Sequence, residues 1–347
     1  MKIGLVDFDG RLTNLALMKL SAFYKQQGHE VMLNPVSPVG LDKTFVSLIF
    51  SKSRDKALST YGHFPDVDFG GTGYSISKKL PDEIEAMRPD YDLYQVSDIY
   101  NRISGRIGKK ENVMKKAEEI VNAGVGFLSR GCPRSCGFCV VPVKEGKLNK
   151  VGNIADIINP RSNRLVLLDN SLCANDDILE ILSEIRDRNL VVDISQGIDV
   201  RLLTPEIAKA LSEVKHMRSL HYAWDAPQAG KSVLAGIEIL SRFVRRSAQM
   251  CFVLTGFDTD FSQDMERVML LKEQGVRPYV MRFQCPNSPA KKEETFEQIR
   301  LRHFQRWVNA PAAIYKTSPF SEYEPWARVQ EKLRGAFDMQ QMELAWG

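Results

Sequence analysis

Apolar, strand-like runs alternate with amphipathic helical segments through the middle of the chain, and this alternation constrains the fold most. Six such runs lie near residues 125, 164, 190, 217, 249 and 277. The segments between them, such as "DDILEILSEIRDRN" and "TPEIAKALSEV", carry apolar residues at three- and four-residue steps, as helices on a parallel sheet do. Six β-α units predict an open, partial β/α barrel, whose functional residues gather on loops after the carboxyl ends of the strands.

The first hundred residues predict a separate, small α/β domain. "KIGLVD" reads as a strand, the helical segment that follows ends at Gly28, and residues 31–33 resume as a strand. A further strand candidate, "TFVSLIFS", and a glycine-rich turn, "FGGTGYS", come later. The expected organisation is an α/β domain over 1–100, a basic linker over 101–123, the barrel over 124–290 and a helical extension over 291–347.

Composition indicates a globular chain. Of the 347 residues, 44% are hydrophobic and 26% charged, and no apolar run approaches the roughly 18 residues of a membrane span. The short apolar start is interrupted at Asp7 and Asp9, so we expect no export signal, no membrane and a cytoplasmic location. The net charge of +4 permits nucleic acid as a partner without arguing for it, because runs such as the basic linker are usually solvated faces.

Three of the six cysteines crowd into "SRGCPRSCGFCVVPVKEG", directly after the first of the six runs. Structural zinc usually takes four protein ligands, and the next cysteine, Cys173, is far along the chain. The loop is polar and rich in turn residues, which disfavours three thiols buried by chance. Three thiolates on a short loop can instead hold three irons of a 4Fe-4S cluster and leave the fourth open to a ligand.

The spacing C-x3-C-x2-C, with Phe138 before the third cysteine, resembles the signature of the radical S-adenosylmethionine superfamily. The resemblance implies that Cys132, Cys136 and Cys139 are the metal ligands at the catalytic centre, and that Phe138 shields the cluster or lies near adenine. It further implies that the open iron binds S-adenosylmethionine, which one electron cleaves to a 5′-deoxyadenosyl radical that abstracts hydrogen from the substrate. An electron donor such as flavodoxin or ferredoxin is then expected.

The same resemblance implies ligand-binding roles for residues in the loops after the later strands. After the second strand, Asp169, Asn170 and Ser171 stand where the methionine amino group is bound, although an ordinary helix cap is the alternative. The resemblance assigns Arg201 to the methionine carboxylate, a role that its paired donors suit; a structural salt bridge is the alternative. The remaining candidates for binding S-adenosylmethionine follow strands three, four and five: Gln196, Asp199, Trp224, Asp225 and Gly256.

The N-terminal domain resembles the Rossmann-like, cobalamin-binding domains that precede many of these barrels. Ser47 and the pair Gly70 and Gly71 stand near the expected cofactor tail, but the Asp-x-His-x-x-Gly motif of histidine-ligated cobalamin is missing. Hydrogen abstraction from an unidentified substrate is therefore preferred over cobalamin-dependent methyl transfer. Methylthio transfer is disfavoured because residues 1–131 contain no cysteine. A non-catalytic iron-sulfur redox or nucleic-acid-binding protein is the alternative outside enzymology.

The remaining thiols have separate expectations. Cys251 lies in an apolar strand and is expected in the core. Cys173 and Cys285 follow strands two and six, where either a packing role or a place at the mouth of the active site is open.

Overall fold

The computed structural model describes residues 1–104, 110–284 and 294–331, which form two compact units, Met1–Arg218 and Ser219–Gly347. The expected domain boundaries at 100, 123 and 290 stay a prediction. No helix in the described ranges is both long enough and apolar enough to cross a bilayer.

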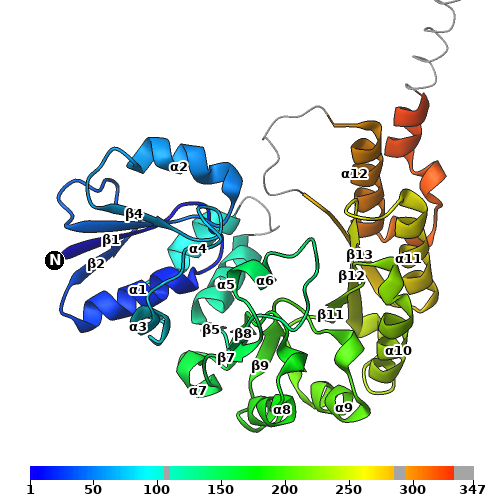
Figure 1. Cartoon of the computed structure of the whole chain (residues 1–347), viewed down its shortest axis with the longest axis horizontal. Helices are drawn as coiled ribbons and strands as arrows, with labels where there is room; N and C mark the ends of the chain where they lie inside the picture. The colour runs from blue at the N-terminus through cyan, green and yellow to red at the C-terminus, as the bar shows by residue number, and fades with distance from the viewer. Residues whose placement is uncertain (105–109, 285–293, 332–347) are drawn as a thin grey trace, which may run out of the picture. The chain divides into compact units, whose positions relative to one another are not determined.

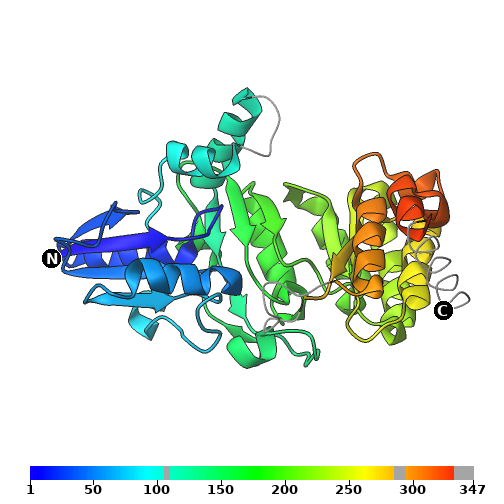
Figure 2. The same ribbon diagram turned by 90° about the horizontal axis from the view of Figure 1, so that it is seen from above.

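The first unit opens with a four-stranded sheet whose strands all run parallel, in the order β2-β1-β3-β4 (Figures 1 and 2). Ile3 and Leu5 pack with α1 on one face, whereas Val6 packs with Val46 and α2 residue Ala57 on the other, as the two-residue period of a strand requires. A sheet with a core on both faces is the predicted α/β arrangement. Its elements are β1 (Lys2–Asp7), α1 (Leu15–Gln26), β2 (Glu30–Leu33), β3 (Lys43–Ser47), α2 (Arg54–Tyr61), β4 (Val67–Gly70), α3 (Asp82–Glu85) and α4 (Val96–Ile103).

A second parallel sheet in this unit has the order β10-β9-β8-β5. Its helices bury one apolar face each; in α8, for example, Ile178, Ile181, Leu182 and Ile185 are buried. A two-stranded antiparallel pair, β6 with β7, brackets the cysteine loop. The elements are α5 (Lys110–Asn122), β5 (Gly124–Gly126), β6 (Ser129–Arg130), α6 (Val141–Lys144), β7 (Asn149–Lys150), α7 (Ile154–Ile157), β8 (Arg164–Leu167), α8 (Ile178–Asp187), β9 (Val191–Ile194), α9 (Pro205–Glu213) and β10 (Lys215–His216).

The second unit holds a three-stranded parallel sheet in the order β11-β12-β13. The expected C-terminal helical extension includes α12, where Phe304 and Trp307 are buried while Phe296 is 48% exposed. The elements are β11 (Leu220–Ala223), α10 (Gly230–Ser241), β12 (Gln249–Thr255), α11 (Phe261–Glu273), β13 (Arg277–Arg282) and α12 (Phe296–Asn309).

All six strands expected for the barrel are present as β5, β8, β9, β11, β12 and β13. These six strands lie in two hydrogen-bonded sheets: β5, β8 and β9 belong to the second sheet of the first unit, and β11, β12 and β13 form the sheet of the second unit. The mixed α/β class with parallel sheets is therefore confirmed, and a continuous six-stranded barrel remains a proposal.

Candidate functional site

The cysteine loop connects β6 to α6, and thus follows the carboxyl end of β5. Cys132, Cys136 and Cys139 are half-buried, and the amide of Cys139 donates to the carbonyl of Cys136 at 3.0 Å. Within residues 1–104, 110–284 and 294–331, no three His, Cys, Asp or Glu side chains are arranged around one point to hold a single metal ion. A cubane places each thiolate on its own iron, so this loop does not need such convergence.

Backbone amides point at two of the three sulfur atoms. The amide of Arg134 lies 3.5 Å from Sγ of Cys132, and that of Val141 lies 3.5 Å from Sγ of Cys139. Amide donors of this kind stabilise thiolate charge and adjust the potential of a bound cluster. The surroundings of Cys132 and Cys139 therefore suit thiolates that bind an iron-sulfur cluster better than neutral thiols packed in an apolar core.

Gly131 closes the base of the loop. Its φ of +83° favours glycine, and a Cβ there would lie 2.2 Å from the carbonyl oxygen of Lys147. Beside it, the amide of Cys132 donates to the carbonyl of Gly146 at 3.3 Å. The chain can enter and leave the cysteine loop side by side because residue 131 has no side chain.

Asp169 and Asn170, two of the predicted ligand-binding residues, hold this base together. The buried carboxylate of Asp169 accepts the amide of Leu128 at 3.1 Å, and both the amide and the hydroxyl of Ser129, at 2.6 and 2.7 Å. Burial raises the pKa of Asp169, although these donors oppose the rise. The side-chain oxygen of Asn170 accepts the amide of Gly131 at 3.1 Å. The side-chain oxygens of Asp169 and Asn170 thus accept hydrogen bonds from donors of the chain itself.

Ser171 is different. Its side chain is buried, with 3% of the residue exposed, and its Oγ has no hydrogen-bond partner within the described part of the chain. A buried hydroxyl without a partner is rare, because it loses its hydrogen bonds to water without replacement. Of the three residues after β8, Ser171 is the one whose polar atom is not already committed.

Asp199, which follows β9, forms ion pairs with two arginines. It accepts Nε of Arg201 at 2.7 Å and Nε of Arg134, from the cysteine loop, at 2.5 Å. Burial alone would raise the pKa of Asp199, but the hydrogen bonds and charges of Arg201 and Arg134 outweigh it and lower the pKa. The salt-bridge alternative for Asp199 and Arg201 is thus present. Gln196, in the turn before them, is exposed.

Arg134 was missed by the sequence reasoning, which treated the residues between the cysteines as a turn. Its signal was a basic side chain inside the C-x3-C segment. Phe138 is half-buried on the same loop.

Two of the other thiols, Cys173 and Cys251, are buried. Cys173, which follows β8, is 5% exposed, and burial, with the charge of Asp199 adding to it, raises its pKa to about 12. Cys251 is fully buried within β12, as predicted, and burial raises its pKa. A thiol with a raised pKa stays protonated and is a poor nucleophile or metal ligand. Cys285 lies outside the described residues.

The predicted residues of the second unit follow β11 and β12. Trp224 is 3% exposed and donates its indole N–H to the carbonyl of Ala226 at 3.1 Å, and Asp225 beside it is half-buried. A Cβ on Gly230 would lie 2.7 Å from the Trp224 ring, so the first residue of α10 must be small. Gly256 is exposed with φ of +74°, a conformation that favours glycine.

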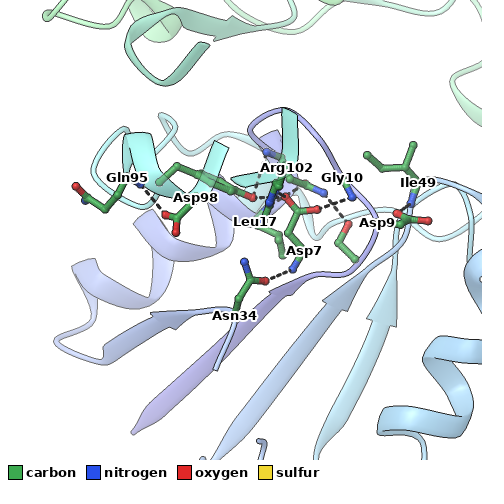
Figure 3. Close-up of polar contacts among 12 residues, drawn as sticks. Asp7, Asp9, Gly10, Leu17, Asn34, Ile49, Gln95, Asp98 and Arg102 are labelled. Atoms are coloured by element: carbon green, nitrogen blue, oxygen red, sulfur yellow. Dashed lines mark hydrogen bonds and ion pairs between the residues drawn. The ribbon is translucent and has the colours of Figure 1, made fainter. Parts of the chain in front are cut away.

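The carboxyl edge of the N-terminal sheet carries a buried polar network (Figure 3). The carboxylate of Asp7 accepts Arg102 at 2.6 Å, the hydroxyl of Tyr94 at 2.7 Å and the amide of Gly10 at 3.2 Å. Burial is the main cause that raises the pKa of Tyr94, which keeps this hydroxyl a donor. The network fixes α4 to the end of β1.

The features that resemble a corrinoid site are used by the chain itself. Ser47 Oγ accepts the side-chain amide of Asn14 at 2.9 Å. A Cβ on Gly71 would lie 2.2 Å from the carbonyl oxygen of Leu48, and one on Gly73 would lie 2.6 Å from the backbone of Phe50. Only Gly70, among these glycines, faces open space. Ser47 and Gly71 thus already have contacts within the chain, and a corrinoid role for this edge of the sheet stays a prediction.

Ion pairs join the N-terminal α/β region to the cysteine loop. Glu85 of α3 binds both Lys19 and Arg130, each at 2.7 Å, and Arg130 also reaches Glu145 at 3.1 Å. Burial would raise the pKa of Glu85, but its hydrogen bond and charge contacts with Lys19 and Arg130 lower it. The residues at both ends of the cysteine loop are thus connected to α3.

No protein-family model matches the chain. Among curated proteins it is similar to the ribosomal protein uS12 methylthiotransferase RimO of Helicobacter acinonychis (strain Sheeba), with 29% identity over 86 residues. The alignment covers 21% of this chain and 20% of RimO, so the chain spans about a fifth of that relative's length.

Two solved structures of SuiB from Streptococcus suis are also similar. The structure bound to S-adenosylmethionine aligns with a TM-score of 0.37 and 12% identity, over 61% of this chain and 56% of SuiB. The structure bound to the precursor peptide SuiA gives 0.37 and 12%, over 60% and 53%.

Proposed function

We infer that this chain is a member of the radical S-adenosylmethionine superfamily, that it binds a 4Fe-4S cluster through Cys132, Cys136 and Cys139, and that it cleaves S-adenosylmethionine reductively. One observation carries the proposal: the three thiols share a loop at the carboxyl end of a parallel strand, and backbone amides point at two of their sulfur atoms. When bound, the cluster would supply the electron that divides S-adenosylmethionine into methionine and a 5′-deoxyadenosyl radical, which takes hydrogen from a substrate.

The chain's own residues then have distinct tasks. Asp169 and Asn170 hold the base of the cysteine loop through backbone amides. Asp199 orients Arg201 through two of its nitrogens, which prepares a planar cation for the methionine carboxylate. Ser171 offers a buried oxygen that accepts a hydrogen bond from the methionine amino group. Gln196, Trp224, Asp225 and Gly256 remain the proposed contacts to the rest of S-adenosylmethionine.

The partners follow from this chemistry. The reaction requires an electron donor of low potential, for which a flavodoxin or ferredoxin is the natural class, and an unidentified substrate with an unactivated C–H bond. The cytoplasm, where cysteines stay reduced, suits this chemistry.

The test is release of 5′-deoxyadenosine. Protein reconstituted with iron and sulfide under anaerobic conditions is mixed with dithionite and S-adenosylmethionine. We expect 5′-deoxyadenosine from the native chain and none from a variant with Cys132, Cys136 and Cys139 replaced by alanine. A fully loaded native protein that releases none would favour the non-catalytic iron-sulfur alternative.

Methyl transfer through cobalamin is the second candidate, but Ser47 and Gly71 are engaged within the chain. Incubation with hydroxocobalamin followed by gel filtration tests it, since retained corrinoid absorbance would restore this candidate. Methylthio transfer, the activity in RimO's name, usually comes with three further N-terminal cysteines in this superfamily. Residues 1–131 have none, so we do not assign it.

A further inference from the structure

One buried arginine joins two loops of the second unit. Arg267 lies on α11 and is 2% exposed. Its guanidinium donates to the carbonyl oxygens of Trp224 at 2.7 Å, Asp225 at 3.0 Å and Leu254 at 2.9 Å. It also donates to Asp264 and, through Nε, to the carbonyl of Gln263 at 3.3 Å. These five acceptors match the five N–H groups that a guanidinium carries.

Three of these acceptors lie where two parallel strands end. Trp224 and Asp225 follow β11, and Leu254 is the penultimate residue of β12. The pairing of β11 with β12 ends at Ala223 and Phe252, so the carbonyls of Trp224, Asp225 and Leu254 lie past the paired part of these two strands. A rigid, charged fork can satisfy carbonyls on both strands together, whereas a single ammonium cannot match their spacing.

Asp264, the ion-pair partner of Arg267, also contacts the loop after β12. Asp264, which is buried beside Arg267, accepts the hydroxyl of Thr259 at 2.7 Å. Thr259 lies in the loop that begins with Gly256. Arg267 and Asp264 therefore hold both loops, one through backbone carbonyls and the other through a threonine hydroxyl.

We propose that Arg267 is a positioning residue that fixes the loops of Trp224, Asp225 and Gly256 in the shape that S-adenosylmethionine binds. The proposal rests on the proposed function for its ligand. The fixing of the loops stands on the hydrogen bonds of Arg267 and of its partner Asp264. In sequence, Arg267 is an ordinary basic residue of an amphipathic helix, and only the fold shows that its side chain points into the core beside Val268 and Leu271.

The test compares two conservative variants of the reconstituted full-length protein. Arg267→Lys keeps a positive charge beside Asp264 but loses the fork. Arg246→Lys is the matched control, since Arg246 donates to Gln274 and Glu238, at the opposite edge of the same sheet, before β12 and β13. Hydrogen exchange of residues 224–229 and 254–260 reports the loops, and equilibrium dialysis with radiolabelled S-adenosylmethionine reports affinity.

We expect Arg267→Lys to speed exchange in both loops and to weaken S-adenosylmethionine binding, each by about tenfold or more, because local opening becomes easier. Arg246→Lys should change neither, and iron content should be equal in both variants. Unchanged loop exchange in Arg267→Lys, or the same losses in Arg246→Lys, would overturn the proposal.

Two further results are distinguishable. If native protein binds no S-adenosylmethionine, the proposed function fails, while loop exchange still decides what Arg267 does. If Arg267→Lys does not fold, the double variant Arg267→Gln with Asp264→Asn, which leaves no buried charge unpaired, is measured in the same way. If both loops of that double variant exchange hydrogen as slowly as they do in native protein, the proposal is contradicted.

Discussion

Removing Arg134 should loosen the cysteine loop while leaving the three thiols in place. Nε of Arg134 lies 2.5 Å from Asp199, with the two side chains 33% and 11% exposed. A charge-assisted hydrogen bond contributes about 1.5–3 kcal/mol when buried, and an exposed pair about 0.2–1 kcal/mol. This half-buried pair therefore stabilises the closed loop by about 1–2 kcal/mol.

The free energy of closing the loop sets how fast iron is lost from it. A factor of ten corresponds to about 1.4 kcal/mol, so Arg134→Gln should raise the population of the open loop about 5- to 30-fold. Iron bound to the loop should then be lost to an excess of ferrous chelator faster by the same factor. The assay is anaerobic, with chelate absorbance followed over time on reconstituted protein.

The control is Arg188→Gln, which breaks an exposed pair with Glu184 within α8 and its C-terminal cap. Iron loss from this variant should match the native rate. A rate for Arg134→Gln within twofold of native would refute the reasoning, because the ion pair would then contribute nothing to closing the loop.

Three further predictions concern single side chains. Ser171→Ala should weaken S-adenosylmethionine binding about fivefold, the worth of one hydrogen bond, without lowering the unfolding midpoint in urea, since Oγ has no hydrogen-bond partner among the described residues to lose; an unchanged dissociation constant would remove Ser171 from the site. Glu85→Gln should flatten the acid dependence of stability: the pKa of Glu85 is lowered from its usual 4.5, so the carboxylate's contribution is complete above that value and is lost as pH falls through the lower folded pKa. Native and variant urea midpoints that fall in parallel between neutral and acid pH would contradict this. Gly73→Ala should lower the thermal midpoint by several degrees, because its Cβ meets the Phe50 backbone at 2.6 Å, while Gly70→Ala, with nothing within 4 Å, should not; equal midpoints would show that the turn relaxes.

The strands and the position of the cysteine loop could be predicted because they depend on local pattern. Runs such as "RLVLLD" and "QMCFVLTGF" are apolar on both faces, which a buried parallel strand requires, and β8 and β12 lie within them. Cys251 was predicted in the core for the same reason.

The partners of the site residues could not be predicted, because they come from distant parts of the chain. Asp169 binds the backbone of Ser129, and Asp199 binds Arg134 across 65 positions. A carboxylate after a strand has the same sequence pattern whether it caps a loop or faces a ligand. Likewise, Gly70 and Gly71 suggested a cofactor tail. Close packing against the Leu48 backbone requires glycine at 71, whereas a Cβ at 70 would meet nothing within 4 Å.

Electron paramagnetic resonance of the reduced, reconstituted protein, recorded with and without S-adenosylmethionine, tests the central claim most directly. Three thiolates on a 4Fe-4S cluster leave one iron without a protein ligand. We predict a 4Fe-4S signal whose g-values shift when S-adenosylmethionine is added, and no such signal after substitution of Cys136. A loaded cluster whose spectrum is unaffected by S-adenosylmethionine, or a loop that takes up zinc in place of iron, would contradict the account.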